Sequence, residues 1–200
     1  MKPVQGLHHI TAVASNPHQN IEFYHHILGQ RLVKKTVNFD DPGTYHLYYG
    51  DEIGTPGTIM TYFPWQQMRR GRKGNGETAA MAYTIRPEAM GFWQSWLPKN
   101  GVSTDERQTR FGADVLPFTD PDGLTLELIT DDSPATLQPW TGGPIGEKEA
   151  LQGFHGVTLW LDAVVSIANL LIHELGYTFV NQDGSRSRYP AGGENVGLYV

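Results

Sequence analysis

The chain has 200 residues and a mass of 22.3 kDa, which is enough to bury a substantial hydrophobic core. Its formal net charge is −6 and its basic residues gather only in the short run Arg69–Lys73, so the broad basic face of a nucleic-acid-binding protein is not expected. The absence of cysteine from the sequence excludes disulfide bonds, thiolate nucleophiles and zinc sites with cysteine ligands.

An opening strand is predicted over Gly6–Val13, whose β-branched residues suit a pleated surface. Side chains alternate between the two faces of a strand, so His9 and Thr11 are expected on one face and His8 on the other. The chain holds eight histidines, and an adjacent pair is as consistent with surface residues as with a metal site. The pair therefore needs support from the rest of the chain.

The chain repeats one order of elements, which is a strand, a helix and three strands. In the first unit, 4–64, the opening strand is followed by a helix over 17–28 and strands over 31–38, 45–49 and 58–63. The second unit, 79–131, has a strand over 79–85, a helix over 87–99 and strands over 107–111, 114–118 and 124–130. A segment rich in Pro and Gly, 132–151, is predicted as a linker. The third unit, 152–200, begins with a strand over 154–160, a helix over 164–174 and a strand near 177–181.

The third unit repeats the first at a constant offset along the sequence. The aligned pairs include Gly29 and Gly176, Thr11 and Thr158, and His8 and His155. At the same offset Gly156 takes the place of His9, so His9 is peculiar to the first unit. Aligning the glycines that end the helices places Met81 at the His9 position of the second unit, and aligning the turn glycines places Glu127 at the position of Thr61. Each unit thus offers at most half of a metal site.

Glu127 is a candidate site residue because it lies within the otherwise apolar run 124–129. A carboxylate among such neighbours is costly to bury unless it is paired, liganded or protonated. The alternative is an edge strand on which Thr125 and Glu127 share a wet face. Glu127 and His155 are together a further candidate site, between the second and third units. It is the weaker candidate, since His155 aligns with His8 and not with His9, the candidate ligand position.

The tandem units resemble the vicinal oxygen chelate superfamily, which includes glyoxalases, bleomycin resistance proteins and extradiol dioxygenases. The likeness rests on a His on the first strand and a Glu after an Asp-Pro-x-Gly turn. Within the superfamily, several segments are similar to hydroquinone-type ring-cleaving dioxygenases, namely Leu7–Thr11, Gly29–Thr36, Tyr45–Tyr49, Gly54–Thr58 and Gly71–Gly74. The resemblance implies an α+β fold in which βαβββ units form paired, cup-like mixed sheets. The first two units would then be one domain, 4–131, and 152–200 the start of a second.

The resemblance also implies an Fe(II) ion bound by two His and one Glu, with Mn(II) and Zn(II) as alternatives. His9 is then expected as a metal ligand, with His8 and Thr11 beside the metal but not bound to it. His8 is expected either to shuttle a proton or to hydrogen-bond and orient the strand. The other His and the Glu come from the second half of the family's chain. These two ligands are expected beyond Val200. We therefore expect this chain to be a portion of a longer protein and to end within the third unit.

The expected function is Fe(II)-dependent cleavage of a hydroquinone- or catechol-type ring with O2, in the degradation of aromatic compounds. The alternatives are a glyoxalase-like, metal-dependent lyase or isomerase and a non-catalytic protein that binds an aromatic ligand. Tyr45, Tyr48 and Tyr49 are candidates for lining an aromatic pocket, with ordinary sheet packing as the alternative. The expected partners are a small aromatic substrate and O2. Neither a nucleic acid nor a membrane is expected as a partner. Whether the protein forms a homo-oligomer is left open by the sequence. A cytoplasmic location is expected, since neither a signal peptide nor a membrane span is visible.

Overall fold

The computed structural model describes residues 4–69, 71–133, 137–192 and 197–200. The first unit contains β1 (His9–Ala14), α1 (Pro17–Ile21), the π-helical segment η1 (Glu22–Ile27), β2 (Arg31–Val37), β3 (Tyr45–Gly50) and β4 (Ile59–Pro64). Asn16 caps the N-terminus of α1, because its Oδ1 accepts hydrogen bonds from the backbone N–H groups of His18 and Gln19 at 2.9 and 3.2 Å. These elements follow the predicted order.

The second and third units repeat this order. The second contains β5 (Glu77–Ile85), the 3-10 turn η2 (Pro87–Ala89), α2 (Met90–Lys99), β6 (Gln108–Arg110), β7 (Ala113–Thr119) and β8 (Thr125–Thr130). The third contains β9 (Phe154–Trp160), α3 (Val164–Asn169), the π-helical segment η3 (Leu170–Glu174), β10 (Asn181–Asp183), β11 (Arg186–Pro190) and β12 (Gly197–Tyr199). The strand predicted near 177–181 is displaced toward the C-terminus, because Tyr177 is buried in the third unit's core and strand pairing starts at Asn181. None of the helices in the described residues is long and apolar enough to cross a membrane.

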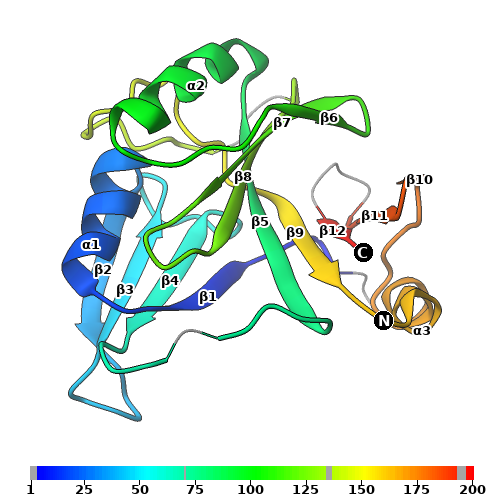
Figure 1. The fold of residues 1–200 in the computed structure, drawn as a ribbon, viewed down its shortest axis with the longest axis horizontal. Coiled ribbons are helices and arrows are strands. Elements are labelled where there is room, and N and C mark those ends of the chain that lie inside the picture. The colour runs from blue at the N-terminus through cyan, green and yellow to red at the C-terminus, as the bar shows by residue number, and fades with distance from the viewer. Residues whose placement is uncertain (1–3, 70, 134–136, 193–196) are drawn as a thin grey trace.

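In each unit the first strand pairs in parallel with the last, as β1 with β4, β5 with β8 and β9 with β12. The first unit forms a four-stranded sheet in the order β1-β4-β3-β2. Antiparallel pairing of β5 with β9 joins the other two units into one eight-stranded sheet (Figure 1). The α+β fold with cup-like mixed sheets is therefore confirmed. The division into domains at 131 and 152 stays a prediction, and the eight-stranded sheet runs across it.

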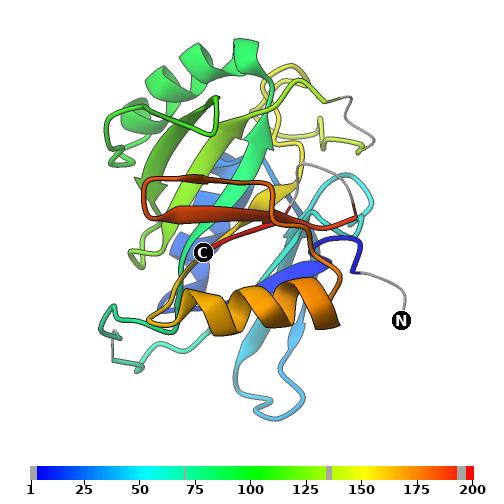
Figure 2. The same cartoon turned by 90° about the vertical axis from the view of Figure 1, so that its right-hand side faces the viewer.

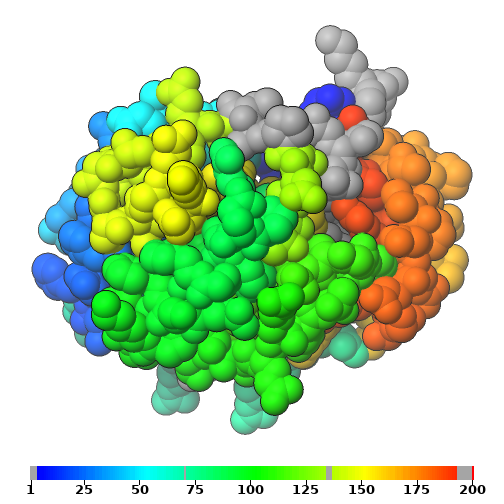
Figure 3. All heavy atoms as spheres, turned by 90° about the horizontal axis from the view of Figure 1, so that it is seen from above, coloured from blue at the N-terminus to red at the C-terminus, as the bar shows by residue number. Residues whose placement is uncertain are grey.

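The second unit lies between the other two. Figure 3 shows the first unit, in blue and cyan, and the third unit, in orange, at opposite ends of the molecule. Figure 2, viewed from the third unit, shows α2 and α3 on opposite sides of the strands. Parts of the predicted linker pack against the core: Ile145 and Ala150 are buried, and the indole Nε1 of Trp93 donates to the carbonyl of Glu149 at 2.8 Å. This segment therefore helps to cover the core.

A buried hydrogen-bond network joins the first unit to the second. The Tyr24 hydroxyl donates to Asp120 Oδ2 at 3.1 Å and accepts a short hydrogen bond from Tyr62. The other carboxylate oxygen of Asp120 accepts hydrogen bonds from the backbone N–H groups of Asp122 and Leu124 at 2.9 and 2.8 Å. Burial raises the pKa of Asp120, against the opposing effect of these hydrogen bonds. The Asp-Pro-Asp-Gly turn thus fixes both its own loop and the helix of the neighbouring unit.

Replacing Tyr24 with Phe is expected to lower the free energy of unfolding by about 1–3 kcal/mol, because it leaves buried polar groups of Tyr62 and Asp120 without their shared partner. Urea denaturation followed by circular dichroism measures this change. The matched control is Tyr45→Phe, which removes a hydroxyl from a side chain that is 44% exposed. Equal midpoints for Tyr24→Phe and the wild type would show that the network contributes nothing to stability.

Candidate functional site

The first candidate site is the face of the four-stranded sheet that carries His9. Along β1, His9, Thr11 and Val13 are exposed, while Ile10 and Ala12 pack against the main core. The predicted placement of His9 and Thr11 on a common face is therefore confirmed, because both are exposed while Ile10, between them, faces the core. We call this open surface, opposite to the core, the His9 face.

Neighbouring strands extend the His9 face with hydroxyl and aromatic groups. Thr11 lies opposite Thr61 on β4, which lies opposite Tyr48 on β3. The Thr61 hydroxyl donates to Thr11 Oγ1 at 2.9 Å. Of the three tyrosines considered from the sequence, Tyr48 belongs to this face, whereas Tyr49 is fully buried in the core and Tyr45 is exposed. The equivalence of Thr61 with a site position was visible in the sequence.

His46 and Phe63 were not singled out from the sequence, although strand alternation from Tyr48 places His46 on the same face. The His46 ring lies 4.0 Å from the Phe63 ring and 4.1 Å from the Tyr48 ring, measured between centroids. His46 Nδ1 is 2.9 Å from the Tyr48 hydroxyl. Partial desolvation lowers the pKa of His46, with smaller contributions from Lys34 and His9. The His9 face therefore combines imidazoles with flat aromatic surfaces.

The expectation that the His8 side chain lies on the other face of the strand from His9 is wrong, because the two imidazoles are in contact. The Nδ1 of His8 lies 3.1 Å from the Nδ1 of His9, and the two rings meet edge-on at 87°. Pairing in β1 begins at His9, so strand alternation does not extend to His8. One imidazole donates through Nδ1 and the other accepts, which leaves Nε2 of His9 as the nitrogen that does not take part in this contact.

The described residues contain no group of three or more His, Asp or Glu side chains that could hold a metal ion. A non-heme Fe(II) site of the expected type needs two His and one carboxylate on one side of the metal. The exposed imidazole of His9 suits one of these three positions.

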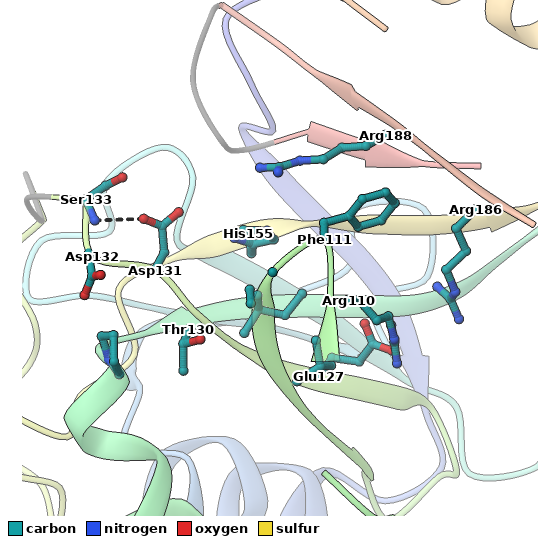
Figure 4. A pocket seen from close by; sticks show the side chains of 15 residues that line it. Arg110, Phe111, Glu127, Thr130, Asp131, Asp132, Ser133, His155, Arg186 and Arg188 are labelled. Atoms are coloured by element: carbon teal, nitrogen blue, oxygen red, sulfur yellow. Dashed lines mark hydrogen bonds and ion pairs between the residues drawn. The ribbon is translucent and has the colours of Figure 1, made fainter. Parts of the chain in front are cut away.

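The second candidate site is the concave face of the eight-stranded sheet, which we call the second cup. It contains a cavity of about 550 Å³ that Glu127 and His155 both line (Figure 4). The structure therefore brings the two residues of the weaker candidate site into one cavity. Arginines from β6 and β11 also line it, namely Arg110, Arg186 and Arg188.

Glu127 is not on a wet edge strand, so that alternative is wrong. Strand β8 lies between β5 and β7, and Glu127 is only 4% exposed. Its Oε1 accepts a hydrogen bond from Arg110 Nη1 at 2.7 Å, with both side chains largely buried. The carboxylate is therefore paired, which is one of the three conditions that make its burial tolerable.

The register of the strands corrects one alignment. Thr11 lies opposite Thr61 in the first unit, and Ala82 lies opposite Glu127 in the second. In the second unit, the residue that corresponds to His9 lies two residues before Ala82 on the same face of the strand. It is therefore Ala80. Met81 points into the core, where it is 2% exposed. With Gly156 as the third-unit equivalent, the second cup has no imidazole at either position that corresponds to His9.

His155 sits at the wall of the second cup, where β9 pairs irregularly with β5. Its Nδ1 lies 3.5 Å from the Thr84 hydroxyl. Burial lowers the pKa of His155 to about 4; the charge of Arg188 acts in the same direction, and that of Asp131 opposes it. The imidazole is therefore neutral at pH 7.

Comparison with known proteins adds a family and several relatives. The family model described as Glyoxalase/Bleomycin resistance protein/Dioxygenase superfamily matches residues 6–128. The protein named "Putative ring-cleaving dioxygenase MhqO" of Bacillus subtilis (strain 168) is 42% identical over 193 residues, which are 96% of this chain and 61% of that protein. A chlorohydroquinone/hydroquinone 1,2-dioxygenase of Sphingobium indicum is 35% identical, over 94% of this chain and 60% of that protein.

A crystal structure of a "putative dioxygenase" from Bacillus subtilis subsp. subtilis str. 168 superposes with a TM-score of 0.93 and 41% identity. The match covers 100% of this chain and 64% of the other. The chain therefore spans about three fifths of the length of these curated relatives.

The low pKa of His155 makes stability depend on pH. The folded protein binds this proton less readily than the unfolded chain, whose histidine has an ordinary value of 6.5. The contribution is therefore fully present above pH 6.5 and is lost as the pH falls toward 4, by an amount on the order of 3 kcal/mol. We expect His155→Gln to flatten the fall in unfolding free energy between pH 7 and pH 4.

Urea denaturation at several pH values measures this slope. His18→Gln, which changes an exposed histidine of α1, serves as the matched control and should keep the wild-type slope. Parallel curves for His155→Gln and the wild type would contradict the assignment.

Proposed function

This chain belongs to the Glyoxalase/Bleomycin resistance protein/Dioxygenase superfamily, and from that premise we propose that it is part of a ring-cleaving dioxygenase that opens a hydroquinone-type ring with O2. The observation that carries the proposal is the exposed His9 imidazole, in contact with His8, on an open sheet face that also presents aromatic rings. The relatives whose names include ring-cleaving or hydroquinone dioxygenase match nearly the whole of this chain, which supports the same reaction.

The proposed metal is Fe(II), and His9 would supply one ligand through Nε2. Metal-binding histidines commonly have their other ring nitrogen held by a neighbouring group, which fixes the orientation of the imidazole. The contact between the Nδ1 atoms of His8 and His9 supports this orienting role for His8. We propose that the second His and the Glu lie in the part of the longer relatives that the match does not cover. When bound, such a metal leaves open positions for the aromatic hydroxyl and O2.

The aromatic groups of the His9 face suit a small aromatic substrate. The rings of Tyr48, His46 and Phe63 form a continuous surface, and stacked or edge-on contacts between aromatic rings are favourable. The exposed hydroxyl of Thr11 would orient a polar group of the substrate, while the buried hydroxyl of Thr61 donates to it and holds it in place. His9 lies on the face of the sheet that is turned away from the core. If His9 lay on the other face, which the helices cover, a non-catalytic binding protein would be favoured instead.

Replacing His9 with Ala in the full-length protein is expected to abolish iron binding and O2 uptake on hydroquinone, because one of three ligands is removed. Iron content after anaerobic reconstitution, together with an oxygen electrode, gives the two readouts. His18→Ala removes an exposed imidazole from α1 and serves as the control. Retained iron stoichiometry in His9→Ala would refute the assignment, and O2-independent turnover would favour a lyase or isomerase.

Replacing His8 with Phe is expected to weaken iron affinity about 10–100-fold, because His9 loses the group that orients it. His8→Asn can still donate to an imidazole nitrogen, so we expect it to restore part of the affinity. Metal titration with a competing chelator measures both variants. If His8 acts only as a proton shuttle, the iron affinity stays at the wild-type value while the rate falls and its pH profile changes.

A further inference from the structure

The second cup has the size of a ligand site. Its cavity of about 550 Å³ lies within the range of roughly 300–1,000 Å³ that is typical of pockets for small molecules. It is bounded by the β6–β7 turn and β8 of the second unit and by β9 and β11 of the third. The cavity therefore forms where the two units meet, on the opposite side of the sheet from the main core.

One wall of this cavity carries guanidinium groups. Arg186 and Arg188 are two residues apart on β11, so their side chains share a face, and Figure 4 shows both reaching into the cavity. Arg186 Nη1 donates to the Thr158 hydroxyl at 3.2 Å. Arg110 is fixed by Glu127 and by Gln108, whose Oε1 accepts from Arg110 Nε and Nη2 at 3.1 and 3.0 Å. The planar guanidinium group matches carboxylate geometry.

The opposite rim is acidic, with Asp131 and Asp132 on the side of the cavity away from Arg186 (Figure 4). The floor is apolar, because Val115 and Ile129 pack there with Ala82. A ligand would therefore be held with its negative end toward β11 and its apolar body along the floor.

Phe111 is held at the edge of the cavity by an unusual backbone conformation. Its φ of 50° is the one positive value at a non-glycine position in the described residues, and Gly112, at 83°, completes the two-residue turn between β6 and β7. Asn and Gly are the residues that such turns favour, so an aromatic residue here is strained. Its backbone N–H donates to Asp183 Oδ2 at 3.3 Å, which ties the turn to β10. Strain of this kind concentrates at functional sites.

We infer that the second cup binds a small organic carboxylate with a flat apolar body, with the carboxylate on Arg186 and Arg188 and the body between Phe111 and the apolar floor. The cup is not a second copy of the metal site, because Ala80 and Gly156 occupy the positions of His9, and Glu127 is engaged by Arg110. An inorganic anion would leave the floor and Phe111 without a contact. The inference does not depend on the reaction proposed for the His9 face.

Calorimetric titration with benzoate tests the inference. We expect benzoate to bind, and both benzyl alcohol, which lacks the charge, and inorganic phosphate, which lacks the apolar body, to bind at least about tenfold more weakly. Arg186→Gln and Arg188→Gln should each weaken benzoate by about tenfold or more. Arg107→Gln is the control, because it removes an exposed guanidinium that pairs with Asp114 outside the cavity, and it should leave the affinity unchanged.

Phe111→Asn separates a binding role from a structural one. Asn suits the turn better than Phe, so the thermal midpoint should be kept or raised while benzoate affinity falls. A lowered midpoint with unchanged affinity would assign Phe111 to structure alone and overturn its part in the site. No detectable benzoate binding in the wild type, or equal affinity in both arginine variants and the wild type, would overturn the inference.

The His9→Ala protein distinguishes this site from the proposed dioxygenase site. It should bind benzoate with wild-type affinity even though it is expected to lose iron. If benzoate binding disappears in His9→Ala and persists in Arg188→Gln, the carboxylate binds on the His9 face and the second cup is not its site. If iron binding proves independent of His9, the proposed function fails while the benzoate results still stand.

Discussion

The structure depends on one constraint, the parallel pairing of the first strand of each unit with its last. This pairing places the two strands that carry the candidate ligand positions side by side at one edge of the unit, with Thr11 opposite Thr61 in the first unit and Ala82 opposite Glu127 in the second. Side-chain alternation then sends these residues to the face opposite the core. The first strand of each unit forms this edge and can pair with the first strand of another unit, as β5 pairs with β9. One pattern of hydrogen bonds thus fixes the site position and the way in which cups are assembled.

Much of the fold could be predicted from the sequence, because hydrophobic periodicity and the turn glycines recur in every unit. The alignment of the first and third units also held, since Thr158 lies opposite Tyr199 as Thr11 lies opposite Thr61. Both units have a helix that ends in a π-helical segment. The second unit begins its helix with a 3-10 turn instead and has one more residue between Ala80 and its helix-ending Gly101 than the first unit has between His9 and Gly29. An alignment on those glycines therefore lands on Met81, one residue too late.

The side-chain partners were harder to predict than the elements. The pairing of Glu127 with Arg110 spans from β8 to β6, so it depends on the registers of two strand pairs. The contact between His8 and His9 depends on where pairing in β1 begins, and element boundaries are the least certain part of a sequence-based prediction. The sequence could thus locate His9 and Thr11 from strand alternation, but it could not orient His8 or show that Glu127 is buried.

Contacts across the second cup contribute to the attachment of the third unit. The separate core of that unit contains only five buried residues among those described, Leu171, Tyr177, Tyr189, Ala191 and Val200. Its attachment therefore depends on contacts with the other units: the β5–β9 ladder, the packing of Val4 against its core, and contacts across the cup such as that from Phe111 to Asp183. A ligand held between Phe111 and the arginines of β11 would bridge the same two units. Since a molecule that binds only the folded form stabilises it by an amount that grows with its free concentration relative to its Kd, occupation of the second cup would strengthen the joint between these units.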